Sequence, residues 1–68
     1  MNDLLSYIIY RAAREYGKDG LFNAIGFSNA FAKVSGVKAK LDGEVVRAML
    51  WGRPDVTHET GGYYRYSP

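Results

Sequence analysis

The sequence predicts an α+β domain in which three helices are followed by a C-terminal β-hairpin. Apolar residues recur at helical spacing over residues 3–16, and two later segments, 28–35 and 43–51, follow residues that can cap a helix. The last part of the chain, about residues 55–67, changes to β-branched and aromatic residues around Gly61-Gly62. The 68 residues are enough for one domain.

The first predicted helix spans residues 3–16, with Asn2 or Asp3 as its N-terminal cap. One face of this helix is apolar and is expected to be buried. It comprises Leu4, Leu5, Ile8, Ile9, Ala12, Ala13 and Tyr16. Gly17 follows directly, where a left-handed C-terminal cap is expected, and residues 18–20 are expected to form a turn.

The second predicted helix spans residues 28–35. Ser28 is its expected cap, and Gly36 its expected end. Phe31 and Val34 are three residues apart and are expected to face the core. The preceding residues 21–26 are ambiguous, because a short strand and a helical turn fit them equally well.

The third predicted helix spans residues 43–51 and starts after Asp42, whose carboxylate can accept a hydrogen bond from a free backbone N–H group. Leu41 precedes this cap and Val46 follows it by four residues, which is the spacing of a hydrophobic staple. The buried side is expected to comprise Val45, Val46, Met49 and Leu50. The Gly-Arg-Pro sequence at 52–54 ends the helix.

The predicted hairpin has strands at about 55–60 and 63–67, joined by a two-residue turn at Gly61-Gly62. Alternation along the second strand places Tyr64 and Tyr66 on one face and Tyr63 on the other. One of these faces is expected to pack on the first helix.

The composition excludes several kinds of site. The chain has no cysteine and one histidine, so neither a disulfide nor a structural zinc site is expected, and no cofactor is indicated. The carboxylates are scattered, and His58 has no serine or cysteine partner at a recognisable spacing. An enzyme is therefore not expected.

Charge and hydropathy bound the cellular setting. Nine Lys and Arg against seven Asp and Glu give a net charge of +2, which permits a polyanionic partner without requiring one. The sequence has no apolar run of about 18 residues, and its first nine residues lack the basic start of a signal peptide. A cytoplasmic protein without a membrane span is expected, associated with the nucleoid if it binds DNA.

Two consecutive segments, FAKVSGV and DGEVVRAML, followed by GGYYR, resemble the winged helix-turn-helix superfamily. The resemblance covers about Phe31 to Tyr66, and the hairpin corresponds to the wing of that fold. Two features depart from the usual pattern. The linker at residues 38–41 is longer than the standard turn, and Gly43 adds flexibility at the start of the third helix.

The resemblance implies binding of duplex DNA through the third helix and the wing. The implied DNA-binding residues are Lys38, Lys40, Gly43, Glu44, Arg47, His58 and Arg65. The two lysines and the backbone N–H groups at the helix start would face phosphates, and Arg47 would reach a guanine edge. Glu44 would either accept from a cytosine amino group or repel phosphate. So few phosphate contacts bind weakly, so a homodimer or cooperative binding is expected.

Structural roles are open for several of these residues. Arg47 can form an ion pair with Glu44 three residues earlier, and His58 can be an ordinary strand surface residue. Arg53 is expected to offset the dipole of the third helix, and Trp51 to belong to the core or cover it.

The alternative function is a protein-interaction module on the same scaffold, and self-association is a third reading. The interface of the protein-interaction module would be the tyrosine-rich strand and the exposed side of the first helix, with Tyr7, Tyr10, Arg11 and Arg14. Surface charge separates the readings. A continuous positive stripe across Lys38, Lys40, Arg47 and Arg65 favours DNA, whereas interruption by Asp42, Glu44 and Asp55 favours a protein partner.

Overall fold

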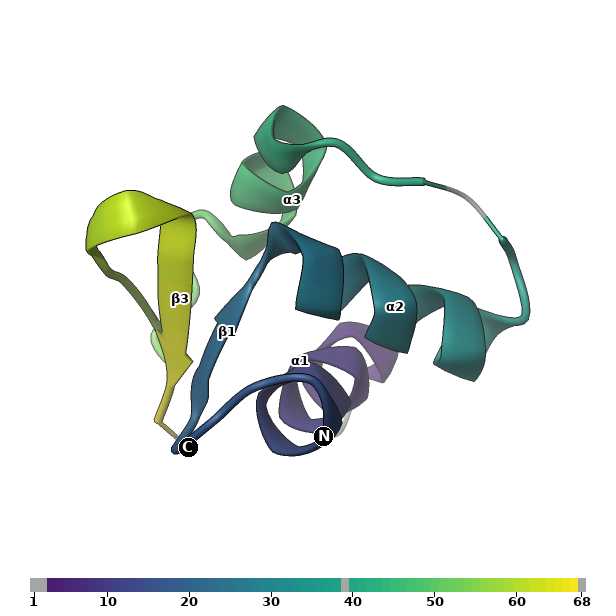
Figure 1. Cartoon of the computed structure of the whole chain (residues 1–68), viewed down its shortest axis with the longest axis horizontal. Helices are drawn as coiled ribbons and strands as arrows, with labels where there is room; N and C mark the ends of the chain where they lie inside the picture. The colour runs from purple at the N-terminus through teal and green to yellow at the C-terminus, as the bar shows by residue number, and fades with distance from the viewer. Residues whose placement is uncertain (1–2, 39, 68) are drawn as a thin grey trace.

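A computed structural model of the chain describes residues 3–38 and 40–67. The elements in order are α1 (Leu4–Glu15), β1 (Leu21–Asn23), α2 (Ala24–Ser35), α3 (Gly43–Leu50), β2 (Val56–His58), the short 3-10 turn η1 (Thr60–Gly62) and β3 (Tyr63–Tyr66). The predicted α+β class with three helices is confirmed, and β1 adds a third strand to the expected hairpin (Figure 1).

The three strands form one antiparallel sheet in the order β1-β3-β2. Tyr64 in the central strand pairs with Phe22 on one side and with His58 on the other. The sheet lies to one side of the helices, and α2 contacts both α1 and α3 (Figure 1). None of the described helices is long and apolar enough to cross a membrane.

The first helix begins at an expected cap residue but does not end as expected. Asp3 is its cap, since the carboxylate accepts a hydrogen bond from the Ser6 N–H at 2.6 Å; Asn2 lies outside the described residues. The prediction of a left-handed cap at Gly17 is wrong, because Tyr16 is the cap residue and Gly17 has no positive φ. Gly17 is required by crowding instead: a Cβ there would lie 2.3 Å from the Leu21 carbonyl oxygen.

The second helix starts earlier than the predicted residue 28. Residues 21–23 form a strand, and the Asn23 side chain caps α2 by accepting a hydrogen bond from the Gly26 N–H at 2.9 Å. Ser28 is therefore inside the helix, where its hydroxyl donates to the Leu41 carbonyl at 3.2 Å. The early start places Phe27, which is fully buried, on the core side. The predicted end is confirmed, with Gly36 at φ +77°.

The third helix is confirmed over residues 43–50, with Trp51 as its C-terminal cap residue. Asp42 caps it as predicted, accepting a hydrogen bond from the Val45 N–H at 2.9 Å. Val46 and Leu50 are fully buried, but the prediction of a buried Val45 is wrong, since that residue is 42% exposed. Among the other elements, α3 packs mainly on α2, so only one narrow side of it is covered.

The predicted hairpin of β2 and β3 is confirmed, but the prediction of a two-residue turn between them is wrong. The last cross-strand pair of β2 and β3 joins His58 to Tyr64, so residues 59–63 make the connection. Gly61 and Gly62 both have positive φ, at +73° and +79°, which explains the glycine pair in a longer loop. The Glu59 N–H donates to the Tyr63 carbonyl at 2.8 Å and closes this loop.

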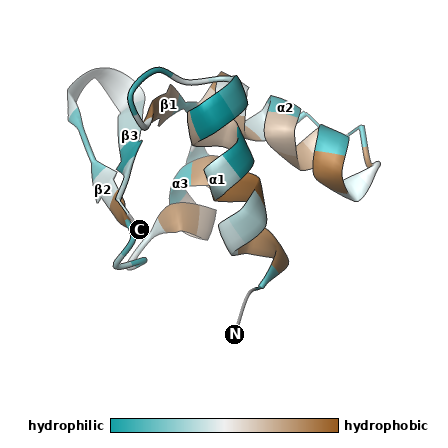
Figure 2. Ribbon diagram, turned by 90° about the horizontal axis from the view of Figure 1, so that it is seen from below, coloured by the Kyte–Doolittle hydropathy of each residue, from teal (hydrophilic) through white to brown (hydrophobic). Residues whose placement is uncertain are grey.

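One hydrophobic cluster joins all three helices and the sheet (Figure 2). Its buried members are Ile8, Ile9, Ala12, Ala13, Phe22, Phe27, Ala30, Val46, Leu50, Val56 and Tyr64. Phe31 and Val34 pack against this cluster, as predicted. Of the two faces of the last strand, the one with Tyr64 and Tyr66 packs inward, while Tyr63 faces outward. The predictions of burial at Leu4 and Tyr16 are wrong, because both lie at the ends of α1, and Leu4 is 59% exposed.

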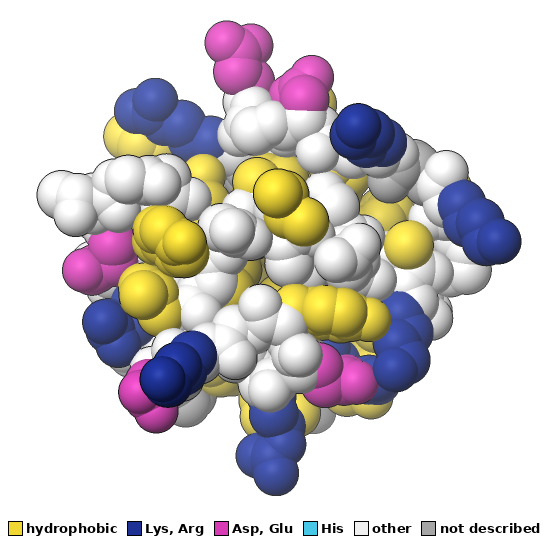
Figure 3. Space-filling model, viewed as in Figure 1, with side chains coloured by type: hydrophobic (Ala, Val, Ile, Leu, Met, Phe, Trp, Pro, Cys, Tyr) yellow, Lys and Arg dark blue, Asp and Glu magenta, His cyan; other side chains and the backbone are white. Residues whose placement is uncertain are grey.

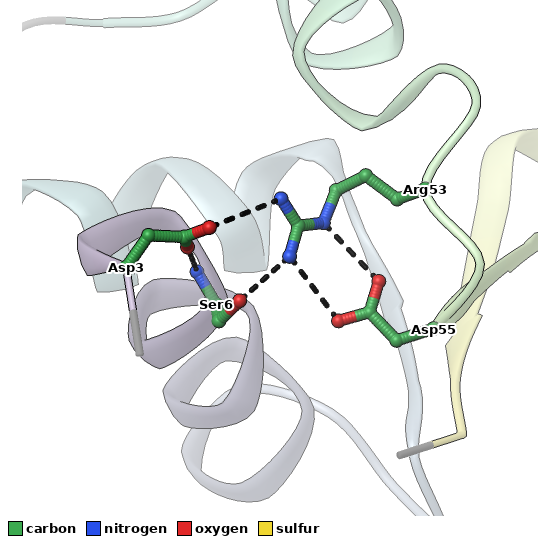
Figure 4. Close-up of polar contacts among 4 residues, drawn as sticks. All are labelled: Asp3, Ser6, Arg53 and Asp55. Atoms are coloured by element: carbon green, nitrogen blue, oxygen red, sulfur yellow. Dashed lines mark hydrogen bonds and ion pairs between the residues drawn. The ribbon is translucent and has the colours of Figure 1, made fainter. Parts of the chain in front are cut away.

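Arg53 joins the segment after α3 to the start of α1 (Figure 4). Its guanidinium donates from Nε to Asp55 Oδ1 at 3.1 Å and from Nη2 to Asp55 Oδ2 at 3.3 Å. Nη2 also donates to the Ser6 hydroxyl at 2.6 Å, and Nη1 lies 4.0 Å from Asp3. The observed role of Arg53 is therefore tertiary, since it connects residues 47 positions apart, and its expected effect on the dipole of α3 stays a prediction.

Candidate binding surfaces

The outer flank of α3 borders a groove that we call the α3 groove. It consists of two hollows of about 620 and 250 Å³, which share Arg47, Gly62 and Tyr64. The remaining lining residues are Ala24, Asp42, Gly43, Glu44, His58, Glu59 and Tyr63. Four residues of the implied DNA-binding set, Gly43, Glu44, Arg47 and His58, thus lie around one groove.

Arg47 is held by an aromatic ring. Its guanidinium carbon lies 5.6 Å from the ring centroid of Trp51, and among the described residues it has no ion pair with Glu44. The Trp51 ring meets His58 edge-on at 5.5 Å, and His58 meets Tyr64 edge-on at 5.0 Å. Trp51 is 68% exposed, so its expected place in or over the core is wrong. These rings form a continuous aromatic strip beside the groove.

The charge of the α3 groove is negative. Its lining has three carboxylates, Asp42, Glu44 and Glu59, against the single guanidinium of Arg47, which gives 1 − 3 = −2 with His58 neutral. Asp42 accepts the capping hydrogen bond, while Glu44 and Glu59 have no ion pair with any described residue. A phosphate approaching this groove meets more negative than positive charge.

The other cations of the implied DNA-binding set lie elsewhere. Lys38 and Lys40 are exposed in the linker before α3, and neither lines the groove. Arg65 lies on the sheet face opposite to the buried Tyr64, where its Nη1 donates to the Asp19 carbonyl at 3.1 Å. On the face of the molecule drawn in Figure 3, Lys and Arg side chains are interspersed with Asp and Glu side chains. Of Lys38, Lys40, Arg47 and Arg65, only Arg47 lines the α3 groove, so the groove does not join these cations into one positive stripe.

A second surface follows the exposed side of α1, and we call it the α1 face. It comprises Tyr7, Tyr10, Arg11, Arg14 and Tyr66. Tyr7 and Tyr10 stack with their ring centroids 6.4 Å apart, and Tyr10 meets Tyr66 edge-on at 6.4 Å. The guanidinium carbons of Arg11 and Arg14 lie 5.5 and 5.9 Å from the ring centroids of Tyr7 and Tyr10.

Two hollows adjoin on the α1 face. The larger one, about 350 Å³, lies between α1, the turn that follows it and Tyr66 at the end of β3, and the smaller one, about 190 Å³, lies toward the start of α1. Tyr10 and Tyr66 line both of them. The other residues of the larger hollow are Ala13, Arg14, Gly17, Asp19 and Gly20. Its glycines and alanine leave room for a side chain from outside.

Ion pairs brace one edge of the α1 face. Glu15 accepts hydrogen bonds from Arg11 and from Lys33 of α2, the latter at 3.2 Å. The Arg11 and Lys33 hydrogen bonds lower the pKa of Glu15 to about 2, and the same contact with Glu15 raises the pKa of Arg11. Arg11 also donates to the Tyr7 hydroxyl at 2.8 Å, which orients that ring.

Comparison of the chain with protein-family models, with curated proteins and with solved structures finds no significant match.

The spacing of Tyr7 and Tyr10 predicted the exposed tyrosines of α1. Tyr66 belongs to the tyrosine-rich strand that was expected to form part of a protein interface, but its edge-on contact with Tyr10 was not foreseen, and neither was the pairing of each arginine with a ring. Only the weak signal of tyrosines at residues 63, 64 and 66 pointed to the strand.

Proposed function

We propose that this chain is a protein-interaction module whose contact surface is the α1 face. The observation that carries the proposal is the ladder of Tyr7, Tyr10 and Tyr66, ordered by two arginines beside an open hollow. Tyrosine and arginine are enriched among the residues that dominate binding energy at protein interfaces. Side chains that are already ordered lose less conformational entropy on binding.

The chemistry of the α1 face indicates the kind of segment that it binds. The larger hollow accepts an apolar side chain between Tyr10 and Tyr66, because its floor is formed by Ala13 and two glycines. Arg14 forms no ion pair with any described residue, so its guanidinium is available to a carboxylate of the partner. The partner is therefore a protein segment with an apolar side chain next to an acidic one.

Selection from a displayed random-peptide library against the full chain tests this proposal. We expect the selected peptides to combine apolar and acidic residues, and Tyr10→Ser and Arg14→Gln each to weaken their binding by about tenfold or more. Tyr16→Ser is the matched control, since Tyr16 is also exposed but lines neither hollow of the α1 face. Equal binding by the wild type, Tyr10→Ser and Arg14→Gln would rule out the α1 face.

Duplex DNA binding by a winged helix-turn-helix domain is the second candidate function. It is supported by the element order, with three helices and a β1-β3-β2 sheet, and by the uncovered flank of α3 that carries Arg47. Lys38 and Lys40 precede that helix and supply positive charge. The three carboxylates of the α3 groove oppose this function.

Fluorescence anisotropy with short DNA duplexes at low salt tests the second candidate. If α3 reads DNA, Arg47→Ala costs about 1–3 kcal/mol of base discrimination, and Lys18→Ala, a control on the turn after α1, leaves it unchanged. Absence of any duplex binding at low salt would contradict the DNA function. Light scattering of the free and bound chain tests the expected homodimer or cooperative assembly.

A further inference from the structure

The α3 groove has the shape and charge of a site for a cation. We propose that this groove binds a basic segment of a partner protein, with a lysine or arginine side chain lying between α3 and the loop of residues 59–63. This surface is separate from the α1 face, so the proposal stands independently of the function proposed above.

The two walls of the α3 groove each contribute a carboxylate. Glu44 lies in the first turn of α3, and Glu59 lies at the start of the loop that connects β2 to β3. Both side chains are exposed, and neither forms an ion pair with a described residue. Glu44 lines the larger hollow and Glu59 the smaller one, and a basic segment that lies along the groove would donate charge-assisted hydrogen bonds to each of them.

Aromatic rings line the same groove. Tyr64 lines both hollows, and Tyr63 lines the smaller one beside Glu59. Tyr64 is only 6% exposed, so the ring available to a cation is that of Tyr63, which is 42% exposed; a cation over its face would be attracted in addition to the carboxylates. Gly62, which also lines both hollows, has nothing within 4 Å of the position that a Cβ would occupy, so the floor is open.

The one cation of the groove does not neutralise these carboxylates. Arg47 is stacked over Trp51, and it forms no ion pair with a described residue. The net charge of −2 in the lining contrasts with the +2 of the whole chain. The groove therefore attracts a cationic probe although the chain as a whole carries a net positive charge.

Titration of the full chain with a fluorescein-labelled tetra-arginine peptide, followed by anisotropy, tests the proposal. We expect saturable binding that Glu44→Gln and Glu59→Gln each weaken by about tenfold. Glu15→Gln changes the net charge equally and lies outside the groove, so it is expected to leave the affinity unchanged. Thermal melting of each variant shows that loss of binding does not come from unfolding.

A short DNA duplex serves as the opposing probe. If both ligands bind in this groove, removal of either carboxylate weakens the binding of a cationic peptide and strengthens the binding of a polyanion. Failure of tetra-arginine to bind at millimolar peptide, or equal weakening by Glu15→Gln, would overturn the proposal. Duplex binding that Glu44→Gln and Glu59→Gln tighten, without peptide binding, would assign the groove to DNA instead.

Discussion

The α1 face and the α3 groove are built from the same parts and differ in the charge around them. Each pairs an arginine with an aromatic ring: Arg14 with Tyr10 at 5.9 Å, and Arg47 with Trp51 at 5.6 Å. The larger hollow of the α1 face has one cation and one carboxylate, Arg14 and Asp19. The α3 groove has one cation and three carboxylates.

This difference shows that the net charge of a small chain does not predict the charge of its surfaces. The total of +2 suits a polyanionic ligand, yet the groove beside α3 is negative. Arg65 supplies positive charge on another face of the sheet. The two surfaces therefore suit different partners, and each can be altered while the other is kept.

Gly17→Ala gives the largest expected effect, at a residue that lines the larger hollow of the α1 face. The new Cβ would lie 2.3 Å from the Leu21 carbonyl oxygen and 2.9 Å from that of Ala13, so the backbone between α1 and β1 must shift. We expect a loss of about 3 kcal/mol in the free energy of unfolding, at the upper end for overpacking. Urea denaturation measures it.

Gly43→Ala is the matched control for Gly17→Ala, because it lies at the α3 groove. Nothing is within 4 Å of a Cβ at residue 43, and this glycine has no positive φ. Alanine there is expected to raise the free energy of unfolding by up to about 1 kcal/mol through the lower entropy of the unfolded chain. Equal destabilisation by both substitutions would show that the two surfaces do not differ in packing as described.

Arg53→Ala sharpens the comparison because Arg53 connects the segment after α3 to the start of α1, where Ser6 lines the smaller hollow of the α1 face. It removes the hydrogen bonds to Asp55 and Ser6 and leaves the half-buried carboxylate of Asp55 without its partner. We expect a loss of about 2 kcal/mol in the free energy of unfolding, within the range for charged hydrogen bonds. A double-mutant cycle with Asp55→Asn measures the coupling energy between Arg53 and Asp55. A coupling energy near zero would contradict a stabilising interaction between these two side chains.

The smallest expected effect is a pH dependence from the edge of the α1 face. The pKa of Glu15 is lowered from 4.5 to about 2 in the folded chain, so its ion pairs add stability above pH 4.5. That contribution is lost as the pH falls from 4.5 toward 2, because the carboxylate becomes protonated. Glu15→Gln should flatten this part of the acid unfolding curve. An unchanged curve would contradict the lowered pKa.

Local signals in the sequence predicted the helices best where capping decides the boundary. Asp42 and Gly36 have the roles expected of them, because an N-terminal carboxylate and a left-handed glycine act within a few residues. Ser28 was an equally good local cap, yet Asn23 is used, because the earlier start brings Phe27 into the core. That choice depends on packing between distant residues.

By itself, the sequence determined the α+β class, the order of three helices and a hairpin, and the exposed tyrosines of α1. Periodicity and caps are local properties, so they can be read from residues that are neighbours in the chain. The tertiary structure alone decided that β1 joins the sheet, that Arg53 reaches Ser6, and that Glu44 and Glu59 share one groove. These features depend on residues brought together from distant parts of the chain, and no local pattern records their distances.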